Sequence, residues 1–219
     1  MTHTPTPRPH DLLWLADPAA LCTDTPLPDW AGADWLARAP LVVRRAPAGA
    51  DGRLPVGLRG RERAQRHATH APHHAVARVL TPETLAQQAP WRDSHLAPCP
   101  AIAALRTLAP QLDAIGLPWG PSGGVGFVLA SGLSVLRPDS DLDLLLRAAT
   151  PLTPPQRAAL RALQGRVACR LDIQIDTGHG GFALNEWLAE APRLLLKTDH
   201  GPRLVRNPWQ DPTLQGATP

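Results

Sequence analysis

The chain has few of the residues and runs that define whole classes of protein. Among 219 residues there are three cysteines, Cys22, Cys99 and Cys169, without CxxC spacing. An odd number at such spacings argues against a disulfide framework and against a zinc site. No apolar run approaches the roughly twenty residues that cross a bilayer, so we expect no membrane partner. The first residues, MTHTP, lack the charged start and apolar core of a secretory signal. We therefore expect a cytoplasmic protein with reduced thiols.

Lysine and tyrosine are also scarce. Lys197 is the sole lysine among 22 basic side chains, and tyrosine is absent. With 26 prolines, this composition most simply reflects a GC-rich genome. The net charge of +3 suits anionic partners but is too small to indicate nucleic-acid binding. Aromatic residues make up 4% of the chain and offer no platform for stacking bases, so we do not expect nucleic acid as a partner.

Length and composition also bound the architecture. A chain of 219 residues with 43% hydrophobic residues can bury one good core or two small ones. Residues 1–9 are rich in proline and threonine, and we expect them to be disordered. Prolines at positions 90, 98 and 100 mark a boundary. The sequence therefore predicts a small N-terminal α+β domain over residues 10–90 and a second domain over residues 91–219.

Hydrophobic periodicity and turn residues indicate the elements of both domains. In the first domain they predict strands at 41–45 and 54–59 and helices at 61–70 and 82–88. In the second they predict a helix at 101–115 interrupted by Pro110, a glycine-rich turn at 119–126 and a hairpin made of 127–130 and 134–136. These elements are followed by strands at 141–146, 170–176 and 194–197 and by helices at 153–163 and 184–189. This order describes an α+β fold with a small mixed sheet flanked by helices.

Two aspartates in the segment Ser140-Asp141-Leu142-Asp143 are the strongest functional signal. On a strand, residues i and i+2 point to the same face, so Asp141 and Asp143 would project side by side. They could be incidental residues on a solvated strand edge. Three leucines follow Asp143, however, which indicates a buried strand, and buried carboxylates need partners. The usual reason to hold two carboxylates together is to bind Mg²⁺ against a phosphate.

A later strand offers the third carboxylate. Residues 170–176 alternate between polar and apolar side chains, so Asp172 and Asp176 share one face. If this strand lies beside the first, Asp172 would complete a triad of metal-binding carboxylates. Asp176 lies nearer the strand end, before a Thr-Gly pair, where capping a turn is the simpler role. We prefer Asp172 and keep Asp176 as the alternative.

The glycine pair Gly123-Gly124 has two interpretations. It could be a loop that needs positive φ. Alternatively, its backbone N–H groups could closely approach a triphosphate, because no Cβ intervenes. The position before two paired aspartates favours the second interpretation.

The cationic residues are ambiguous as well. Arg59, Arg63 and Arg66 lie in a basic segment that could simply be a solvated helix face. Because arginine forks match phosphate oxygens, these residues could instead bind phosphate or an acidic carrier protein. Lys197 could be a charge at a strand end or a contact for the triphosphate.

Together these residues resemble a known superfamily. A glycine-rich turn, a strand with two aspartates and a third carboxylate on a later strand are similar to the nucleotidyltransferases related to polymerase β. In that superfamily the turn usually stands closer to the first aspartate than Gly124 does here. Ser131-Gly132 lies closer, in reversed order, and is a second candidate for the phosphate-binding turn.

A narrower resemblance covers nearly the whole chain. Its segments are HDLLW at 10–14, VGLRG at 56–60, GGVGF at 123–127, SDLD at 140–143, NEW at 185–187, LKT at 196–198 and GPRLV at 201–205. In this order they resemble the phosphoribosyl-dephospho-CoA transferase family of malonate decarboxylase, also called its holo-acyl-carrier-protein synthase (the MdcG family). The resemblance implies an enzyme whose residues 91–219 form a nucleotidyltransferase-like catalytic domain.

The resemblance also implies a reaction. A serine of the apo acyl-carrier subunit would attack the α-phosphate of triphosphoribosyl-dephospho-CoA, and pyrophosphate would leave. Asp141, Asp143 and Asp172 would hold Mg²⁺, Asp172 could instead accept the serine proton, and Gly123 and Gly124 would bind the pyrophosphate. The expected substrate contacts are completed by Ser140, Arg59, Arg63, Arg66 and Lys197. Adenylyl transfer to another acceptor is the alternative activity, and a non-catalytic binding module is the third hypothesis.

Overall fold

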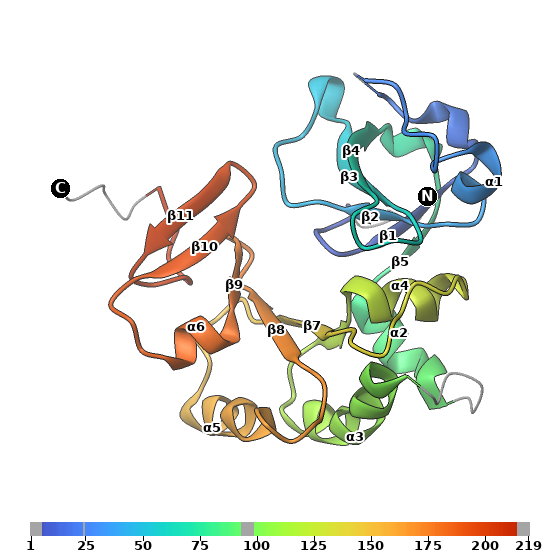
Figure 1. Cartoon of the computed structure of the whole chain (residues 1–219). Helices are drawn as coiled ribbons and strands as arrows, with labels where there is room; N and C mark the ends of the chain where they lie inside the picture. Colours follow the sequence, from blue (N-terminus) through green and yellow to red (C-terminus); the bar gives the residue numbers. More distant parts are fainter. Residues whose placement is uncertain (1–5, 24, 93–98, 214–219) are drawn as a thin grey trace. The chain divides into compact units, whose positions relative to one another are not determined.

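The computed structural model describes residues 6–23, 25–92 and 99–213 (Figure 1). Two compact units are present. Unit 1 comprises residues 1–81 and 127–135, and unit 2 comprises residues 82–126 and 136–219. The division at 81 precedes the predicted boundary at 90, which stays a prediction. Of the N-terminus expected to be disordered, residues 1–5 lie outside the described residues, while the Arg8 N–H donates to Asp11 Oδ2 at 2.8 Å. Within the described ranges, no helix is long and apolar enough to cross a membrane.

Unit 1 is built on an antiparallel five-stranded sheet in the order β4-β3-β2-β1-β5. Its apolar side chains form one cluster around Leu13, Val56 and Leu58. The strands are β1 (Leu12–Leu15), β2 (Leu41–Val43), β3 (Leu54–Arg59), β4 (Arg66–Ala71) and β5 (Val76–Leu80). The short helical segments are η1 (Pro18–Ala20), α1 (Ala33–Leu36), η2 (Ala50–Gly52) and η3 (His73–Ala75).

Unit 2 is built on a six-stranded mixed sheet in the order β11-β10-β9-β8-β7-β6. The parallel neighbours β7 and β8 are joined through α5, whereas the other pairs are antiparallel. The strands are β6 (Trp119–Pro121), β7 (Leu142–Arg147), β8 (Leu171–Asp176), β9 (Gly181–Ala183), β10 (Leu194–Thr198) and β11 (Gly201–Val205). The helices assigned wholly to it are α2 (Pro82–Gln88), η4 (Pro90–Arg92), α3 (Pro100–Ala114), α5 (Pro154–Leu163) and α6 (Leu184–Leu188).

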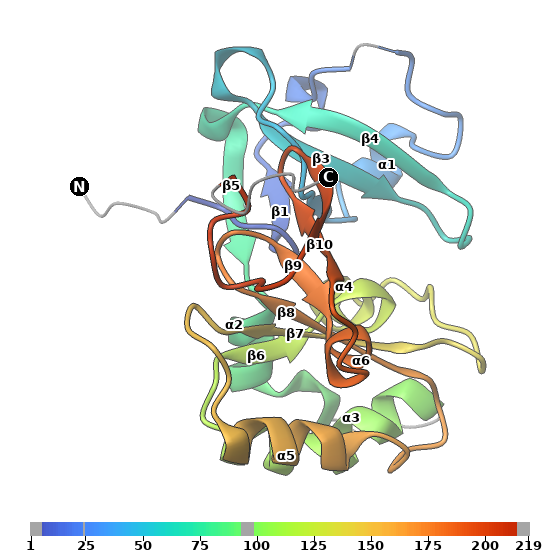
Figure 2. The same cartoon turned by 90° about the vertical axis from the view of Figure 1, so that its left-hand side faces the viewer.

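The apolar face of β7 and β8 is covered by helices. Both views place α3 and α5 together on one side of these strands (Figures 1 and 2). Helix α5 begins with a capping box, in which the side chains of Thr153 and Gln156 each accept from the other's backbone N–H. Its buried Leu160 and Leu163 face the core. The predicted helix start at Thr153 and the α+β class are therefore confirmed.

The helix predicted over 61–70 is wrong. Residues 66–71 form β4, which pairs with β3 residue by residue from Arg59↔Arg66 to Leu54↔Ala71. Thr69 and Ala71 are buried, while Arg66 and Ala68 are exposed, the alternation expected of a strand with one covered face. Polar residues on both faces concealed this period in the sequence.

The hairpin predicted from 127–130 and 134–136 is also wrong, because residues 123–131 form helix α4 (Gly123–Ser131). A short apolar run suits a strand or a buried helix equally well. The helix is closed by Gly132, whose N–H donates to Val128 O at 2.8 Å with φ +70, the role that glycine commonly takes after a helix. Ser131-Gly132 thus ends a helix rather than turning a hairpin.

Helix α3 continues through Pro110 instead of being interrupted there. Pro110 is exposed, so its ring projects away from the core while Leu105, Leu108 and Leu112 pack inward. The sequence did not predict the strands β1, β5, β6, β9 and β11. Each is short, and its pairing with neighbouring strands determines its structure more than its own composition does.

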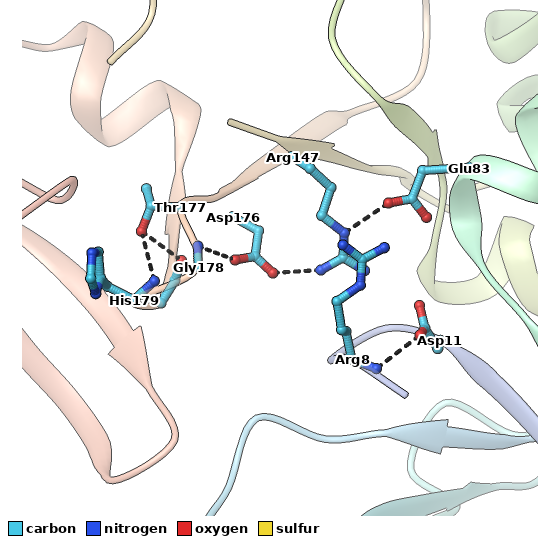
Figure 3. A network of polar contacts seen from close by, with 9 residues as sticks. Arg8, Asp11, Glu83, Arg147, Asp176, Thr177, Gly178 and His179 are labelled. Carbon is cyan, nitrogen blue, oxygen red and sulfur yellow. Dashed lines mark hydrogen bonds and ion pairs between the residues drawn. The ribbon is translucent and has the colours of Figure 1, made fainter. Parts of the chain in front are cut away.

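A buried ionic network lies at the C-terminal ends of β7 and β8 in unit 2 (Figure 3). Arg147 Nη1 donates to Asp176 Oδ2 at 2.6 Å, and Arg147 Nε donates to Glu83 Oε1 at 2.8 Å. The side chains of Arg147 and Asp176 are only 10% and 5% exposed. Asp176 Oδ1 also accepts from the Gly178 N–H at 2.9 Å. A buried guanidinium is thus matched by two carboxylates from different elements.

Replacing Asp176 with asparagine should lower the free energy of unfolding by about 3 kcal/mol, because it leaves a buried guanidinium poorly compensated. Urea unfolding followed by tryptophan fluorescence measures the loss. The matched control is Glu190→Gln, which removes the charge that pairs with Arg157 and Arg161 at the exposed surface and should cost less than about 1 kcal/mol. Equal losses in the two variants would contradict the role of the network.

Candidate active site

Asp143 and Asp172 lie directly opposite one another on the parallel strands β7 and β8. Residues in register on neighbouring strands point to the same face about 4.8 Å apart, so the two carboxylates share one position on the sheet. Both are half-buried, while the preceding Leu142 and Leu171 are buried on the opposite face. The neighbouring strands therefore bring together two carboxylates that are 29 residues apart in sequence.

Asp141 stands immediately before β7, next to the same end of the sheet. Its Oδ2 lies 3.8 Å from Nη1 of Arg170, which precedes β8. The carboxylate is 23% exposed and the arginine side chain 72% exposed. Because Leu142 N donates to Arg170 O at 2.9 Å, the start of the β7–β8 ladder fixes the backbones of both residues. Sequence reasoning missed Arg170, whose contact depends on the register of two strands.

Gly123 places the start of α4 against the Asp143 carboxylate. A Cβ added at Gly123 would overlap the carboxylate oxygen Oδ2, and its φ of +54 also favours glycine. The preceding Ser122 N–H donates to Asp143 O at 2.9 Å, which ties the helix start to β7. The first N–H groups of a helix have no intrahelical acceptor and carry partial positive charge, so Gly123 and Gly124 present backbone donors beside an acidic residue.

This donor set suits a hard divalent cation together with a phosphate. Carboxylate oxygens are the ligands that Mg²⁺ prefers, and it commonly uses one or two of them plus substrate phosphates rather than a complete protein cage. Among the described residues, no group of three His, Cys, Asp or Glu side chains is arranged around a metal position. Asp143 and Asp172 supply carboxylate oxygens from one position of the sheet, and such a pair fits a cation that is held partly by its substrate. Because Gly123 has no Cβ, the Asp143 carboxylate can lie directly against the start of α4.

Asp176 lies at the other end of the same strand. Four residues separate it from Asp172, about 13 Å along a strand, and it is buried against Arg147. Lys197 aligns with this end as well, because both Asp176 and Lys197 pair with Gly181. Thus Asp172 stands beside Asp143, whereas Asp176 and Lys197 stand at the far end of the sheet.

The remaining residues expected at the site lie in the turn before Asp141 and at the end of the β3–β4 hairpin. Ser140 Oγ accepts from the Arg137 N–H at 2.8 Å and shapes the turn before Asp141. In unit 1, Arg59 and Arg66 face each other across the end of the β3–β4 hairpin, and Arg63 is exposed in its turn. The Arg59 guanidinium lies 5.6 Å from the centroid of the Phe127 ring. The three arginines therefore gather at one hairpin end.

An open hollow of about 300 Å³ adjoins Asp141, lined also by Asp139, Cys169 and Arg170. Burial raises the pKa of the Cys169 thiol, and neighbouring backbone N–H groups only partly oppose this. The thiol therefore stays protonated at neutral pH and is a poor nucleophile.

Two family models match the chain, and both describe parts of a transferase. The model of the phosphoribosyl-dephospho-CoA transferase MdcG N-terminal domain matches residues 8–82, and that of the MdcG C-terminal domain matches residues 84–208. The chain belongs to the phosphoribosyl-dephospho-CoA transferase family.

Curated relatives agree over nearly the whole length. The phosphoribosyl-dephospho-CoA transferase of Pseudomonas aeruginosa is 48% identical over 206 residues, covering 93% of this chain and 94% of the relative. The proteins of the same name from Azotobacter vinelandii and Klebsiella pneumoniae are 45% and 43% identical, covering 94% and 93% of this chain and 95% and 97% of their own lengths. No solved structure matches the chain.

Gly123→Ala should lower the rate of phosphoribosyl-dephospho-CoA transfer by about a hundredfold, because the new Cβ displaces the Asp143 carboxylate and small displacements cost that much. Gly116→Ala is the matched control. Gly116 has φ +74 but open space around a built Cβ, so it carries the backbone strain of about 1–2 kcal/mol without touching the site. Equal transfer rates in the two variants would show that the overlap with Asp143 has no effect on catalysis.

Proposed function

We propose that the protein is a Mg²⁺-dependent enzyme that transfers phosphoribosyl-dephospho-CoA from triphosphoribosyl-dephospho-CoA to a serine of the apo acyl-carrier subunit of malonate decarboxylase, releasing pyrophosphate. The observation that carries the proposal is the alignment of Asp143 with Asp172 beside Gly123. The names of the relatives support the group transferred. The resemblance of the sequence segments supports the donor and acceptor.

The carboxylates take two roles in this proposal. Asp141 and Asp143 hold Mg²⁺, which when bound neutralises charge on the phosphate oxygens. Asp172, which aligns with Asp143, either adds a further oxygen ligand to the metal or accepts the proton of the serine hydroxyl. The serine oxygen forms a bond to the α-phosphorus as the bond from that phosphorus to pyrophosphate breaks.

The start of α4 receives the leaving group. N–H groups of Gly123 and Gly124 donate to oxygens of the departing pyrophosphate, as helix starts do for other phosphates. Because Gly123 has no Cβ, the backbone can approach both the phosphate and Asp143. The donors are positioned before reaction, so no reorganisation is needed when charge develops.

The carrier subunit is the proposed macromolecular partner. Carrier proteins are typically acidic, and Arg63 and Arg66 are exposed at the end of the β3–β4 hairpin. Opposite charges on two proteins speed their encounter more than they tighten the complex. We therefore assign these arginines to carrier recognition rather than to chemistry.

Asp143→Asn should lower transfer about a thousandfold or more, the scale of losing a group that stabilises the transition-state charge. The measurement is the mass increase of purified apo carrier subunit incubated with triphosphoribosyl-dephospho-CoA and Mg²⁺. Asp51→Asn, on a side chain that is 87% exposed, is the charge-matched control and should retain the wild-type rate. EDTA should stop the reaction and excess Mg²⁺ restore it.

Two outcomes would contradict the proposal. Wild-type transfer by Asp143→Asn would remove the carboxylate from the mechanism, and transfer in EDTA would remove the metal. Labelled ATP in place of the donor tests the alternative activity. Incorporation of adenylate into the carrier or into another acceptor, without transfer from triphosphoribosyl-dephospho-CoA, would favour a general adenylyltransferase.

A further inference from the structure

Unit 1 contains a pocket of about 650 Å³ that the reaction described above does not use. It is formed by the segment leading into α1, by α1 itself and by the turn between β3 and β4. The residues on which the argument depends are Trp30, Gly32, Asp34, Trp35, Arg61 and Gln65. Small-molecule sites commonly have volumes of roughly 300–1,000 Å³, so the pocket is large enough for a nucleotide.

The aromatic part of the pocket is rigidly held. The Trp35 Nε1–H donates to Arg59 O at 2.8 Å, and the indole stacks on Phe127 with ring centroids 6.4 Å apart and planes 22° from parallel. Trp30 is half-buried and packs against the core of unit 1. An aromatic wall held by a hydrogen bond and packing needs little ordering when a ligand binds.

A guanidinium lies over this wall. The Arg61 carbon Cζ is 5.1 Å from the centroid of the Trp35 ring, a cation–π contact. A guanidinium is planar, and the face of Arg61 turned away from Trp35 can receive a second flat group, as proteins stack nucleic-acid bases on arginine planes. The same cation favours a phosphate nearby.

The remaining lining is mostly polar and acidic. Asp29, Asp34 and Glu62 supply carboxylates, and Gln65 supplies an amide, whose Oε1 accepts from the Glu62 N–H at 3.0 Å. Carboxylates accept hydrogen bonds and suit a ligand with an amino group. A flat ring that carries an amino group and is linked to phosphates combines all the features that the pocket recognises, and adenine nucleotides have this chemistry.

We infer that this pocket binds the adenine nucleotide portion of the dephospho-CoA group. The inference rests on the proposed function for the identity of the ligand, but the pocket and its chemistry do not depend on the carboxylates of unit 2. The adenine ring lies on the face of Arg61 that is turned away from Trp35, its amino group donates to a pocket carboxylate, and the phosphates lie by the guanidinium.

The test is binding of dephospho-CoA to the full-length protein, measured by isothermal titration calorimetry with ADP and pantetheine as fragments. Arg61→Ala should weaken binding of dephospho-CoA and ADP about tenfold, equivalent to 1.4 kcal/mol, and leave binding of pantetheine, which has neither base nor phosphate, unchanged. Arg78→Ala is the matched control, because Arg78 makes the same kind of contact over Trp14 at 4.5 Å and does not line the pocket.

A second variant fills the pocket instead of removing a contact. Gly32 has φ −65 and nothing within 4 Å of a built Cβ, so Gly32→Phe introduces bulk without backbone strain. It should abolish ADP binding while the melting temperature stays that of the wild type. Unchanged binding of dephospho-CoA in both variants would overturn the inference.

The result separates the inference from the proposed function. If Asp143→Asn stops transfer but Arg61→Ala and Gly32→Phe bind ADP as the wild type does, the function stands and the pocket assignment fails. If both pocket variants lose ADP while Asp143→Asn transfers normally, the pocket is a nucleotide site and the proposed chemistry fails.

Discussion

The parallel register of β7 and β8 is the constraint on which the rest of the site depends. It places Asp143 opposite Asp172 at one end and Arg147 opposite Asp176 at the other. Because strand side chains alternate with a period of two, a slip by one residue would move every one of these groups to the opposite face. The buried Arg147–Asp176 pair contributes little net stability, as buried pairs often do. We regard its main effect as excluding other registers, so that the buried ion pair at one end keeps Asp143 aligned with Asp172 at the other.

Helix α4 meets two requirements at its first residue. The chain must start a helix where the backbone comes close to Asp143, and the Asp143 carboxylate must have room beside that backbone. Gly123 satisfies both, because its φ of +54 suits a residue without a Cβ and any Cβ would overlap the carboxylate. The nine residues of α4 also fill part of the interval between the glycine pair and Asp141.

Local signals predicted those parts of the fold that local interactions determine. The alternation in 170–176, the cap at Thr153 and the paired aspartates each depend on neighbours in sequence, and β8, α5 and the position of Asp143 followed from them. Residues 66–71 form a strand and residues 127–131 form part of a helix because of contacts with distant segments. Their own composition favours neither structure over the other. The contact of Arg170 with Asp141 and the grouping of Trp30, Trp35 and Arg61 likewise require the folded backbone. Sequence reasoning therefore found the carboxylates and the glycine beside Asp143, and missed Arg170 and the pocket of unit 1.

Arg147 and Arg170 both pair with carboxylates of this sheet but differ in burial. Arg147 is 10% exposed and bonds two carboxylates at 2.8 Å or less. Removing either carboxylate therefore leaves the buried guanidinium charge poorly compensated, because water does not replace the lost partner. Arg170 is 72% exposed and stands 3.8 Å from Asp141, an arrangement worth less than about 1 kcal/mol. Such a pair can separate at little cost. The carboxylates near Gly123 are thus partly exposed, whereas Asp176 beside Arg147 is buried, and this difference in burial distinguishes the two ends of one face of a single sheet.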